Sequence, residues 1–239
     1  GLTRSGMKLS EDEKRLIAYH EAGHTLVAYE LPNTDPVHKV TIIPRGRAMG
    51  VTHQLPKEDR YIYKKPQLED RISVMLGGRA AEETVFKTST TGAENDLQQA
   101  SQMAKKMVTS WGMSDVLGKI HLQDESGNVF LGEELARGKQ YSEQTAREVD
   151  MEVRQILEHA FTRARDIMTN ERVALEALVE ALIEKEEISG EDVDRIIREA
   201  LGRPEKPKKP KKPEKPETQE EPEKTAKSAE GGNEKDPEE

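Results

Sequence analysis

The sequence predicts a mainly α-helical fold, with a small β-hairpin or sheet beside an N-terminal helix and a helical bundle toward the C-terminus. Residues 9–31 read as a helix, because Ser10 and Glu13 form an S-x-x-E capping box at its start and Pro32 closes it. Residues 37–43 are rich in β-branched side chains and precede a turn-like segment, which indicates a strand. Beyond residue 120, apolar residues recur at helical spacing.

The composition narrows the classes of function. The 239 residues carry a net charge of −9 and no basic stripe dominates them, so a nucleic-acid partner is not expected. The chain has no cysteine, so a metal would have to be held by histidine and carboxylate side chains. No stretch reaches the roughly 20 apolar residues that cross a bilayer, and the first residues do not form a signal peptide. The chain as given is therefore expected to be soluble.

Residues 204–239 are predicted to be a disordered tail. They combine closely spaced prolines with lysine and glutamate, and they lack large apolar side chains. Interleaved glutamates favour a solvated tail over a site for nucleic acid or lipid.

The predicted helix at 9–31 contains the segment AYHEAGHTLVA, in which two histidines stand four residues apart. They belong to a set with helical spacing that should face the interior, namely Ile17, His20, His24, Val27 and Leu31. A lone histidine on such a face is more often a hydrogen-bonded core residue than a ligand. Two histidines flanking an acid are rare by chance in a chain with six histidines.

The spacing of His20, Glu21 and His24 suits zinc-dependent hydrolysis. Residues i and i+4 project from adjacent turns, so both imidazoles can meet one Zn²⁺ at roughly 2.0–2.1 Å. Glu21 lies about 100° round the helix, where it can hold a water molecule and take its proton as the general base of an H-E-x-x-H hydrolase. Gly23 would let another segment or a substrate approach the helix closely.

A catalytic zinc needs a third protein ligand, and the residues leave two candidates. The extended pattern with a third histidine fails, because that position holds a glutamate on the wrong side of the helix. One candidate is the pair Glu82 and Glu83 in a predicted helix. The other is Asp96, near the start of a helix that Thr91 and Glu94 would cap. The spacing of apolar residues predicts that this helix buries Leu97, Ala100, Ala104, Met107 and Trp111. A rigid position at a helix N-terminus gives Asp96 a modest preference.

Five blocks follow one another along the chain: HEAGH (20–24), PVHKVTIIPRGRAMG (36–50), LGGRAAEE (76–83), TTGAENDL (90–97) and WGMSDVLG (111–118). Together they resemble the protease domain of FtsH-type membrane-anchored ATP-dependent zinc metalloproteases. The resemblance implies a helical metalloprotease domain that hydrolyses peptide bonds of unfolded or membrane proteins.

The resemblance also implies roles for individual residues. It assigns the ligands of one Zn²⁺ per chain to His20, His24 and Asp96. Glu21 becomes the general base for a metal-activated water. Glu82 and Glu83 become candidates for supporting a ligand through hydrogen bonds, or plain surface charge.

The resemblance further implies a larger assembly. Family members carry an ATPase module and usually membrane helices ahead of this domain, and they form homohexamers. This chain has no G-x-x-x-x-G-K-[ST] loop, so ATP would be used by that missing module of the same polypeptide and not bound here. The full-length protein is expected in the bacterial inner membrane, with this domain on the cytoplasmic side. The expected parts are a linker (1–9), a zinc-binding peptidase core (10–120), a C-terminal helical part (121–203) and the tail (204–239).

Two departures from the family pattern stand out. Phe86-Lys87 replaces the usual Phe-Gly, which makes a positive φ less secure there. Trp111 replaces a more common tyrosine, and we expect this to alter packing only.

A second extended run at 50–55 is predicted to pair with 37–43 as a hairpin. If the strand at 37–43 has a free edge beside the zinc, an unfolded substrate could add to it at Val40, Thr41 and Ile42. The alternative is a structural hairpin that covers the active-site helix.

The region after residue 120 is predicted to hold three helices that pack as an antiparallel bundle. The first begins at Ser142, the second at Asn170, and the third begins at Ser189 with Asp192 and ends at Gly202. The alternative function is a helical oligomerisation module with a structural zinc, which four protein ligands would close.

Overall fold

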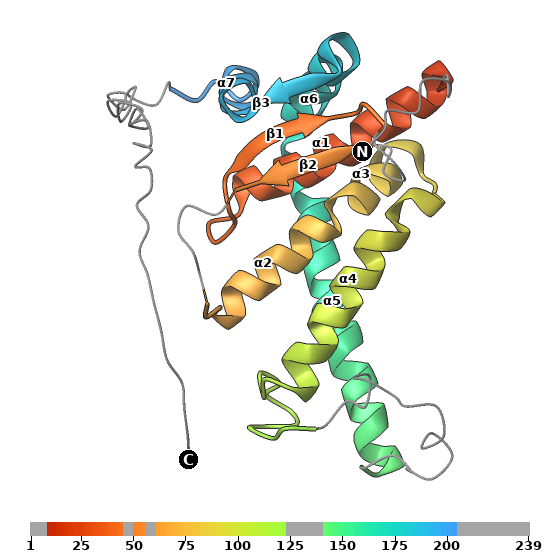
Figure 1. The fold of residues 1–239 in the computed structure, drawn as a ribbon, viewed down its shortest axis with the longest axis vertical. Helices are drawn as coiled ribbons and strands as arrows, with labels where there is room; N and C mark the ends of the chain where they lie inside the picture. The colour runs from red at the N-terminus through yellow and green to blue at the C-terminus, as the bar shows by residue number, and fades with distance from the viewer. Residues whose placement is uncertain (1–8, 45–49, 56–60, 123–140, 205–239) are drawn as a thin grey trace, which may run out of the picture. The chain divides into compact units, whose positions relative to one another are not determined.

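The computed structural model describes residues 9–44, 50–55, 61–122 and 141–204, all within one compact unit. Most of this unit is helical, with one three-stranded antiparallel sheet (Figure 1). The predicted mainly α fold with a small sheet is therefore confirmed. The predicted linker and tail lie outside the described residues, apart from their innermost residues Leu9 and Pro204.

The helices and strands follow one another in a simple order. They are α1 (Glu11–Glu30), β1 (Val37–Thr41), β2 (Val51–Gln54), α2 (Lys65–Met75), α3 (Gly77–Phe86), the 3₁₀ turn η1 (Thr91–Ala93), α4 (Glu94–Thr109), α5 (Glu143–Asn170), α6 (Arg172–Lys185), β3 (Glu187–Ser189) and α7 (Gly190–Ala200).

Helix α1 is the central element. Its first turn is fixed by the predicted capping box, in which the Glu13 N–H donates to Ser10 Oγ at 3.2 Å and the Ser10 N–H donates to Glu13 Oε2 at 2.9 Å. Every residue from Ile17 to Ala28 is buried, because α1 packs against α3, α6 and the sheet together. More of α1 is therefore buried than the single row of helically spaced residues that the sequence predicts.

The sheet has the order β2-β1-β3, so β1 is its central strand. Val40 pairs with Thr52 on one side and with Ile188 on the other. The substrate site at Val40, Thr41 and Ile42 required a free edge on β1; this condition is not met, because β1 is paired on both sides and the three residues are buried. Strand β3 was not predicted, because three residues are too few to show an alternating pattern.

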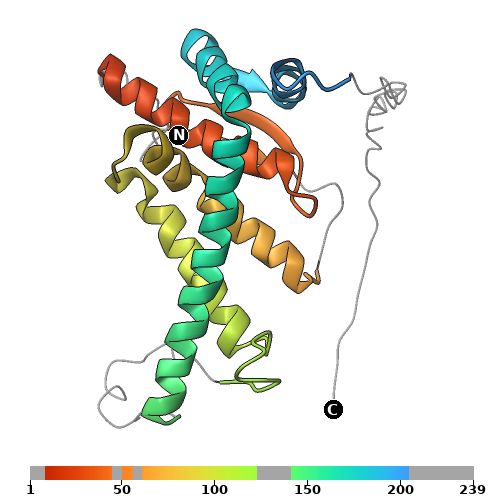
Figure 2. The same ribbon diagram turned by 180° about the vertical axis from the view of Figure 1, so that it is seen from behind.

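Helix α5 joins the two halves of the chain. It has 28 residues, or about 42 Å at the usual helical rise. Its Ala164 and Met168 belong to the main core with α1 and α6, its Ala160 belongs to a second core with α2 and α4, and its Val149 packs near the end of α4. Seen from behind, α5 lies across the helices α1, α2, α3 and α4 (Figure 2). The C-terminal helices thus share one core with the preceding region and do not form a separate bundle.

Helices after residue 140 begin close to the predicted positions. Ser142 caps α5, and the capping box of Ser189 and Asp192 starts α7, both as predicted. Asn170 does not begin a helix: it is the last residue of α5, and α6 begins two residues later.

The start and the buried face of α4 differ from the prediction. Thr90, not Thr91, provides the cap: its Oγ1 accepts from the Gly92 N–H at 3.1 Å, at the start of η1. Leu97 and Trp111, which were expected to be buried, are 37% and 47% exposed. The buried face of α4 consists mainly of small residues and is narrower than predicted.

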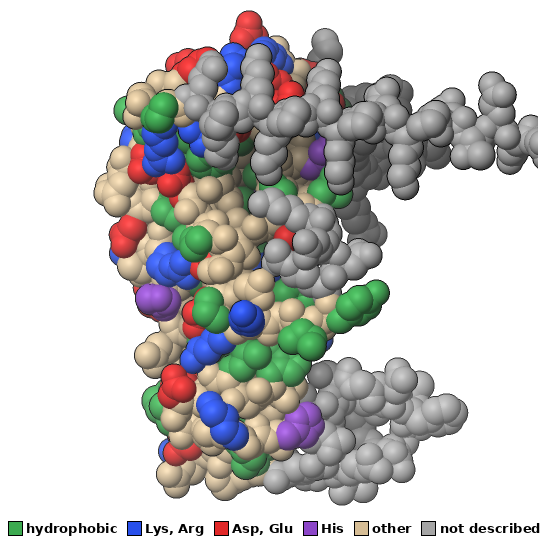
Figure 3. Space-filling model, turned by 90° about the vertical axis from the view of Figure 1, so that its left-hand side faces the viewer, with side chains coloured by type: hydrophobic (Ala, Val, Ile, Leu, Met, Phe, Trp, Pro, Cys, Tyr) green, Lys and Arg blue, Asp and Glu red, His purple; other side chains and the backbone are tan. Residues whose placement is uncertain are grey.

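Acidic and basic side chains are interspersed on the face drawn in Figure 3, and neither sign covers a large area. Among the described residues, no helix combines the length and the apolar character needed to cross a membrane.

Candidate metal centre

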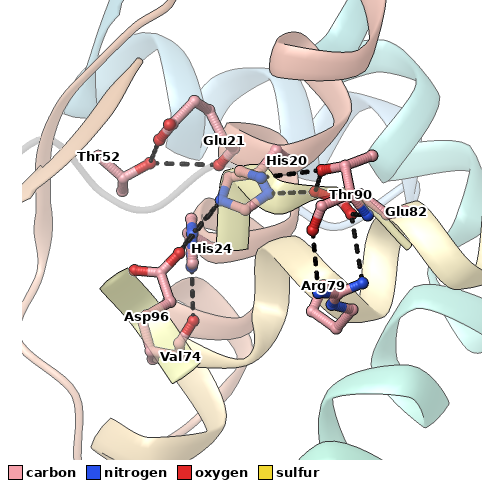
Figure 4. A network of polar contacts seen from close by, with 10 residues as sticks. His20, Glu21, His24, Thr52, Val74, Arg79, Glu82, Thr90 and Asp96 are labelled. Atoms are coloured by element: carbon pink, nitrogen blue, oxygen red, sulfur yellow. Dashed lines mark hydrogen bonds and ion pairs between the residues drawn. The ribbon is translucent and has the colours of Figure 1, made fainter. Parts of the chain in front are cut away.

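Three potential ligand atoms from two helices converge in the structure (Figure 4). His20 and His24 lie on consecutive turns of α1, and Asp96 lies in the first turn of α4. The two Nε2 atoms are 3.0 Å apart, and Asp96 Oδ2 lies 3.2 Å from each of them. Both imidazoles are buried, whereas Asp96 is partly exposed.

The Nδ1 atom of each histidine has a hydrogen-bond partner, on the side of the ring away from the other ligands. His20 Nδ1 lies 2.8 Å from Glu82 Oε1, and His24 Nδ1 lies 2.7 Å from the backbone oxygen of Val74. Both partners are acceptors, so each Nδ1 carries a hydrogen and each Nε2 directs a lone pair at the other and at the Asp96 carboxylate. Three acceptors this close repel one another unless a proton or a cation lies between them.

The arrangement fits zinc. Ligand atoms at roughly 2.0–2.1 Å from a tetrahedral Zn²⁺ stand about 3.3 Å apart, close to the separations of 3.0 and 3.2 Å observed here. Two imidazole nitrogens and a carboxylate oxygen are a ligand set that zinc accepts. His20, His24 and Asp96 can therefore hold this metal.

The same geometry perturbs the pKa values of the group. Burial lowers the pKa of His20, but hydrogen bonds with Asp96 and Glu82 outweigh it and raise this pKa to about 9. Burial raises the pKa of Asp96, but hydrogen bonds with the two histidines hold it well below its usual range. Burial and the contact with His20 likewise oppose one another at Glu82, whose pKa is lowered overall. The metal-free site therefore binds a proton at neutral pH. The carboxylates of Asp96 and Glu82, which attract this proton, would also attract a metal cation.

Glu82 connects His20 to the segment that leads to Asp96. Its side chain is fully buried, and its carboxylate accepts from the Thr90 N–H at 3.0 Å and from Thr90 Oγ1 at 3.1 Å. Arg79 donates to the Thr90 carbonyl at 3.0 Å. Glu83 lies apart from the ligands, and its carboxylate accepts from Ser89 Oγ at 3.2 Å.

Glu21 lies beside the three ligands and is not one of them. It is buried, and its Oε2 accepts a hydrogen bond from Thr52 Oγ1 at 2.8 Å. In Figure 4, Glu21 and Thr52 lie on one side of His20, while Glu82, Thr90 and Arg79 lie on the other. Within the part of the chain that the structure describes, the ligand group has three members.

Glycines allow α1 and α3 to touch at the site. A Cβ on Gly23 would lie 2.4 Å from the carbonyl oxygen of Gly77, and a Cβ on Gly78 would lie 2.5 Å from the His20 ring. The segment that approaches Gly23 is thus helix α3 and not a substrate.

Sequence reasoning missed several residues of this network, namely Thr52, Val74, Arg79 and Thr90. Val74 acts through its backbone carbonyl, which no side-chain pattern reveals. Arg79 and Thr90 occur in the blocks LGGRAAEE and TTGAENDL, but nothing in their spacing indicates their contacts.

Comparison with known proteins agrees with this site. The description "Peptidase family M41" matches residues 7–196. The chain belongs to peptidase family M41. The predicted resemblance to FtsH protease domains is confirmed by relatives named "ATP-dependent zinc metalloprotease FtsH", with or without a number.

The M41 relatives are longer than this chain. The protein from Salinibacter ruber is 56% identical over 197 residues, which cover 82% of this chain and 29% of that protein. The protein from Magnetococcus marinus is 48% identical over 204 residues, which cover 85% and 30%. The protein from Pseudothermotoga lettingae is 47% identical over 203 residues, which cover 84% and 32%. The chain therefore spans about a third of the length of these relatives.

Proposed function

We propose that this chain is the peptidase domain of an FtsH-type protease and that it hydrolyses peptide bonds with one Zn²⁺ held by His20, His24 and Asp96. The observation that carries the proposal is the triangle of two Nε2 atoms and one carboxylate oxygen, 3.0 and 3.2 Å on its sides, beside the buried Glu21. The names of the M41 relatives, which specify a zinc metalloprotease, support it.

The residues divide the chemistry among them. Zn²⁺, when bound, lowers the pKa of water and stabilises negative charge on the carbonyl oxygen of the substrate. Glu21 is the general base: its carboxylate takes a proton from the attacking water as the oxygen bonds to the carbonyl carbon. The same carboxylate then delivers that proton to the amide nitrogen as the C–N bond breaks. Glu82 and Val74 hold the two imidazoles in the tautomer that leaves Nε2 free.

The alternative of a structural zinc is less well supported. Structural zinc sites are closed by four protein ligands, whereas three are grouped here among the described residues. The carboxylate of Glu21, beside the three ligands, is hydrogen-bonded to Thr52. An open position for water and substrate is therefore the better interpretation.

Substrate binding is reassigned from β1 to β2. Among the described residues, β2 pairs with β1 alone, so its other edge is available to an extended peptide. Thr52 on this strand touches Glu21, so a peptide on that edge would lie near the base. Such binding would read backbone conformation more than side-chain identity, which suits unfolded substrates.

The β2 edge can be tested with proline. The Leu55 N–H donates toward β1, so the alternating N–H of Gln54 points to the open edge. We expect Gln54→Pro to raise KM for a peptide severalfold with kcat nearly unchanged. Gln54→Ala is the matched control, because it removes the same side-chain bond to Asp35 but keeps the N–H. Equal KM values for both variants would contradict the assignment.

The proposal extends to the longer protein. The relatives are named as ATP-dependent, so we infer an ATPase module elsewhere in the same polypeptide, a homohexamer anchored in the bacterial inner membrane, and unfolded or membrane proteins as substrates. Gel filtration of the full-length protein in detergent tests the hexamer, and a smaller particle would contradict it.

The base is tested by Glu21→Gln. We expect peptide hydrolysis to fall by roughly 10²- to 10⁴-fold, because the proton acceptor is lost while the metal ligands remain. Zinc per chain, measured by mass spectrometry, should stay at one, and a chelator should abolish wild-type activity. Glu94→Gln is the matched control, since Glu94 is exposed and lies two residues from Asp96. Normal activity in Glu21→Gln would remove the assigned role.

A further inference from the structure

Strand β2 holds the side chain of Glu21 in place. The α-carbon of Gly50 faces the carboxylate so closely that a Cβ there would lie 2.6 Å from Oε1 and 2.7 Å from Cγ. Two residues further on, Thr52 Oγ1 donates to Oε2 at 2.8 Å. The start of β2 and the residue just before it, Gly50, therefore supply a hydrogen bond and a wall for the same carboxylate.

The Thr52 hydroxyl has three possible acceptors within reach. It lies 2.8 Å from Glu21 Oε2, 3.2 Å from the Glu21 backbone oxygen and 3.4 Å from Thr25 Oγ1. That backbone oxygen already accepts from Thr25 Oγ1 at 2.7 Å. Because hydrogen bonds to an ionised acceptor are the stronger ones, the single Thr52 proton belongs on the carboxylate.

The other carboxylate oxygen is left for chemistry. Glu21 Oε1 has no hydrogen-bond partner among the described residues, whereas Oε2 has Thr52. A glutamate side chain has three rotatable bonds, so a base on such a chain needs at least one fixed contact to meet a water molecule in one orientation.

We propose that Thr52 is the positioning residue for the general base: it fixes Glu21 Oε2, so that Oε1 faces the reacting water. This inference rests on the proposed function, because it assumes that Glu21 is the base. It adds a residue of the β2 edge strand to the machinery that otherwise lies on the helices α1, α2, α3 and α4. A purely structural role for Thr52, in which its hydroxyl only stabilises the contact between β2 and α1, is the opposing interpretation.

The principal test is Thr52→Val, which keeps the size and branching of the side chain but removes the donor. We expect kcat on an unstructured peptide to fall roughly tenfold to a hundredfold, because the base loses its orientation. KM should change less than about twofold and zinc per chain should stay at one, since no metal ligand contacts Thr52. Thr52→Ser restores a hydroxyl and should recover most of kcat.

A matched control is Thr84→Val. Thr84 lies on α3 and its buried hydroxyl has no hydrogen-bond partner among the described residues, so this variant makes the same chemical change without removing a hydrogen bond. Its kcat should equal that of the wild type. A wild-type kcat in Thr52→Val, or a Thr52→Ser variant no more active than Thr52→Val, would overturn the inference.

Two further measurements exclude a merely structural effect. In the Glu21→Gln background, Thr52→Val should have no further effect on the residual rate, because the base it positions is absent. An equal loss in both backgrounds would overturn the proposal. A crystal structure of metal-free Thr52→Val should show the Glu21 carboxylate displaced or in several rotamers, and an unchanged carboxylate would also overturn it.

Gly50→Ala keeps the idea testable if Thr52→Val does not fold. The added Cβ must push the carboxylate away, so kcat should fall while zinc content is retained. An unchanged kcat in a folded Gly50→Ala variant would contradict the proposal that the β2 region positions the Glu21 carboxylate. Failure of the proposed function looks different: Glu21→Gln would then keep full activity, whatever the Thr52 variants do.

Discussion

The two histidines of the centre differ in what holds their Nδ1 atoms. His20 contacts the carboxylate of Glu82, whereas His24 contacts the carbonyl of Val74. A carboxylate behind an imidazole raises its basicity and fixes its orientation. Glu82 also accepts two hydrogen bonds from Thr90, which lies in the segment between α3 and Asp96. One buried side chain thus positions a ligand on α1 and the segment that leads to the ligand on α4.

Glu82→Gln should therefore lower zinc affinity by roughly tenfold to a hundredfold, because an amide cannot replace the charged acceptor behind His20. Competition with a chromophoric chelator measures this affinity. Its neighbour offers a matched control: among the described residues the Glu83 carboxylate is hydrogen-bonded to Ser89 and to no metal ligand, so Glu83→Gln should bind zinc like the wild type. Equal affinities in the two variants would show that Glu82 is not a support of the metal site.

The metal-free protein should lose stability as the pH rises. The pKa of His20 is raised from an unfolded value of 6.5 to about 9, so its contribution is complete below pH 6.5 and disappears as the pH passes through about 9. The loss is on the order of 3 kcal/mol. Urea unfolding at several pH values measures it. The zinc-loaded protein is the control and should lack this dependence, since its ligands no longer carry the proton; the same slope with and without zinc would contradict the expectation.

At the scale of elements, α3 ends at a residue whose backbone conformation is unusual for its residue type. Lys87 adopts φ 56° and ψ 30°, the left-handed conformation that favours glycine. The loss of the family glycine therefore did not remove the positive φ, because the segment between α3 and η1 must turn back so that Thr90 can reach Glu82. The tertiary contact overrides the local preference of lysine.

Lys87→Gly should consequently stabilise the protein by about 1 kcal/mol, because glycine adopts this conformation without a Cβ penalty. The exposed lysine side chain gives up little packing. The urea midpoint of the zinc-free protein reports the change. Lys87→Ala separates the cause, since alanine keeps the Cβ and should show no gain. An equal increase for alanine and glycine would point to the loss of the lysine charge instead.

At the scale of the whole molecule, α5 makes one unit of the described residues. It packs against α1, α2, α3 and α4 on its way to α6, and residues from both sides of position 120 share the main core. The helices that carry the ligands and Glu82 are therefore braced by an element far away in the sequence. The geometry of the metal centre is thus supported by contacts within this chain.

The chain alone should cleave flexible peptides and unfolded proteins but leave a stably folded protein intact. The sequence has no phosphate-binding loop with which to drive unfolding, so ATP should have no effect on the rate. Gel assays with casein and with a thermostable globular protein, each with and without ATP, test this. A chelator serves as the control for zinc dependence. ATP-stimulated degradation of the folded substrate would contradict the prediction.

The sequence by itself determined the local features of this protein. The capping box at Ser10, the hairpin, and the i, i+4 spacing of His20 and His24 depend on neighbours in the chain, so their patterns are visible in the letters. The lack of cysteine similarly restricted any metal site to histidines and carboxylates before a structure was known.

Only the tertiary structure decided which distant residues meet. His20 contacts Glu82 and Asp96 across 62 and 76 residues of sequence, and the three-residue β3 turns β1 into a central strand. From periodicity, Glu82, Glu83 and Asp96 were competing carboxylates, because each could lie on a helix near the site. Packing of α3 and α4 against α1 placed Glu82 behind His20 and Asp96 beside both imidazoles. It left Glu83 at the surface. Helical periodicity describes a face of one element, and the partner of that face is set by the packing of the whole core.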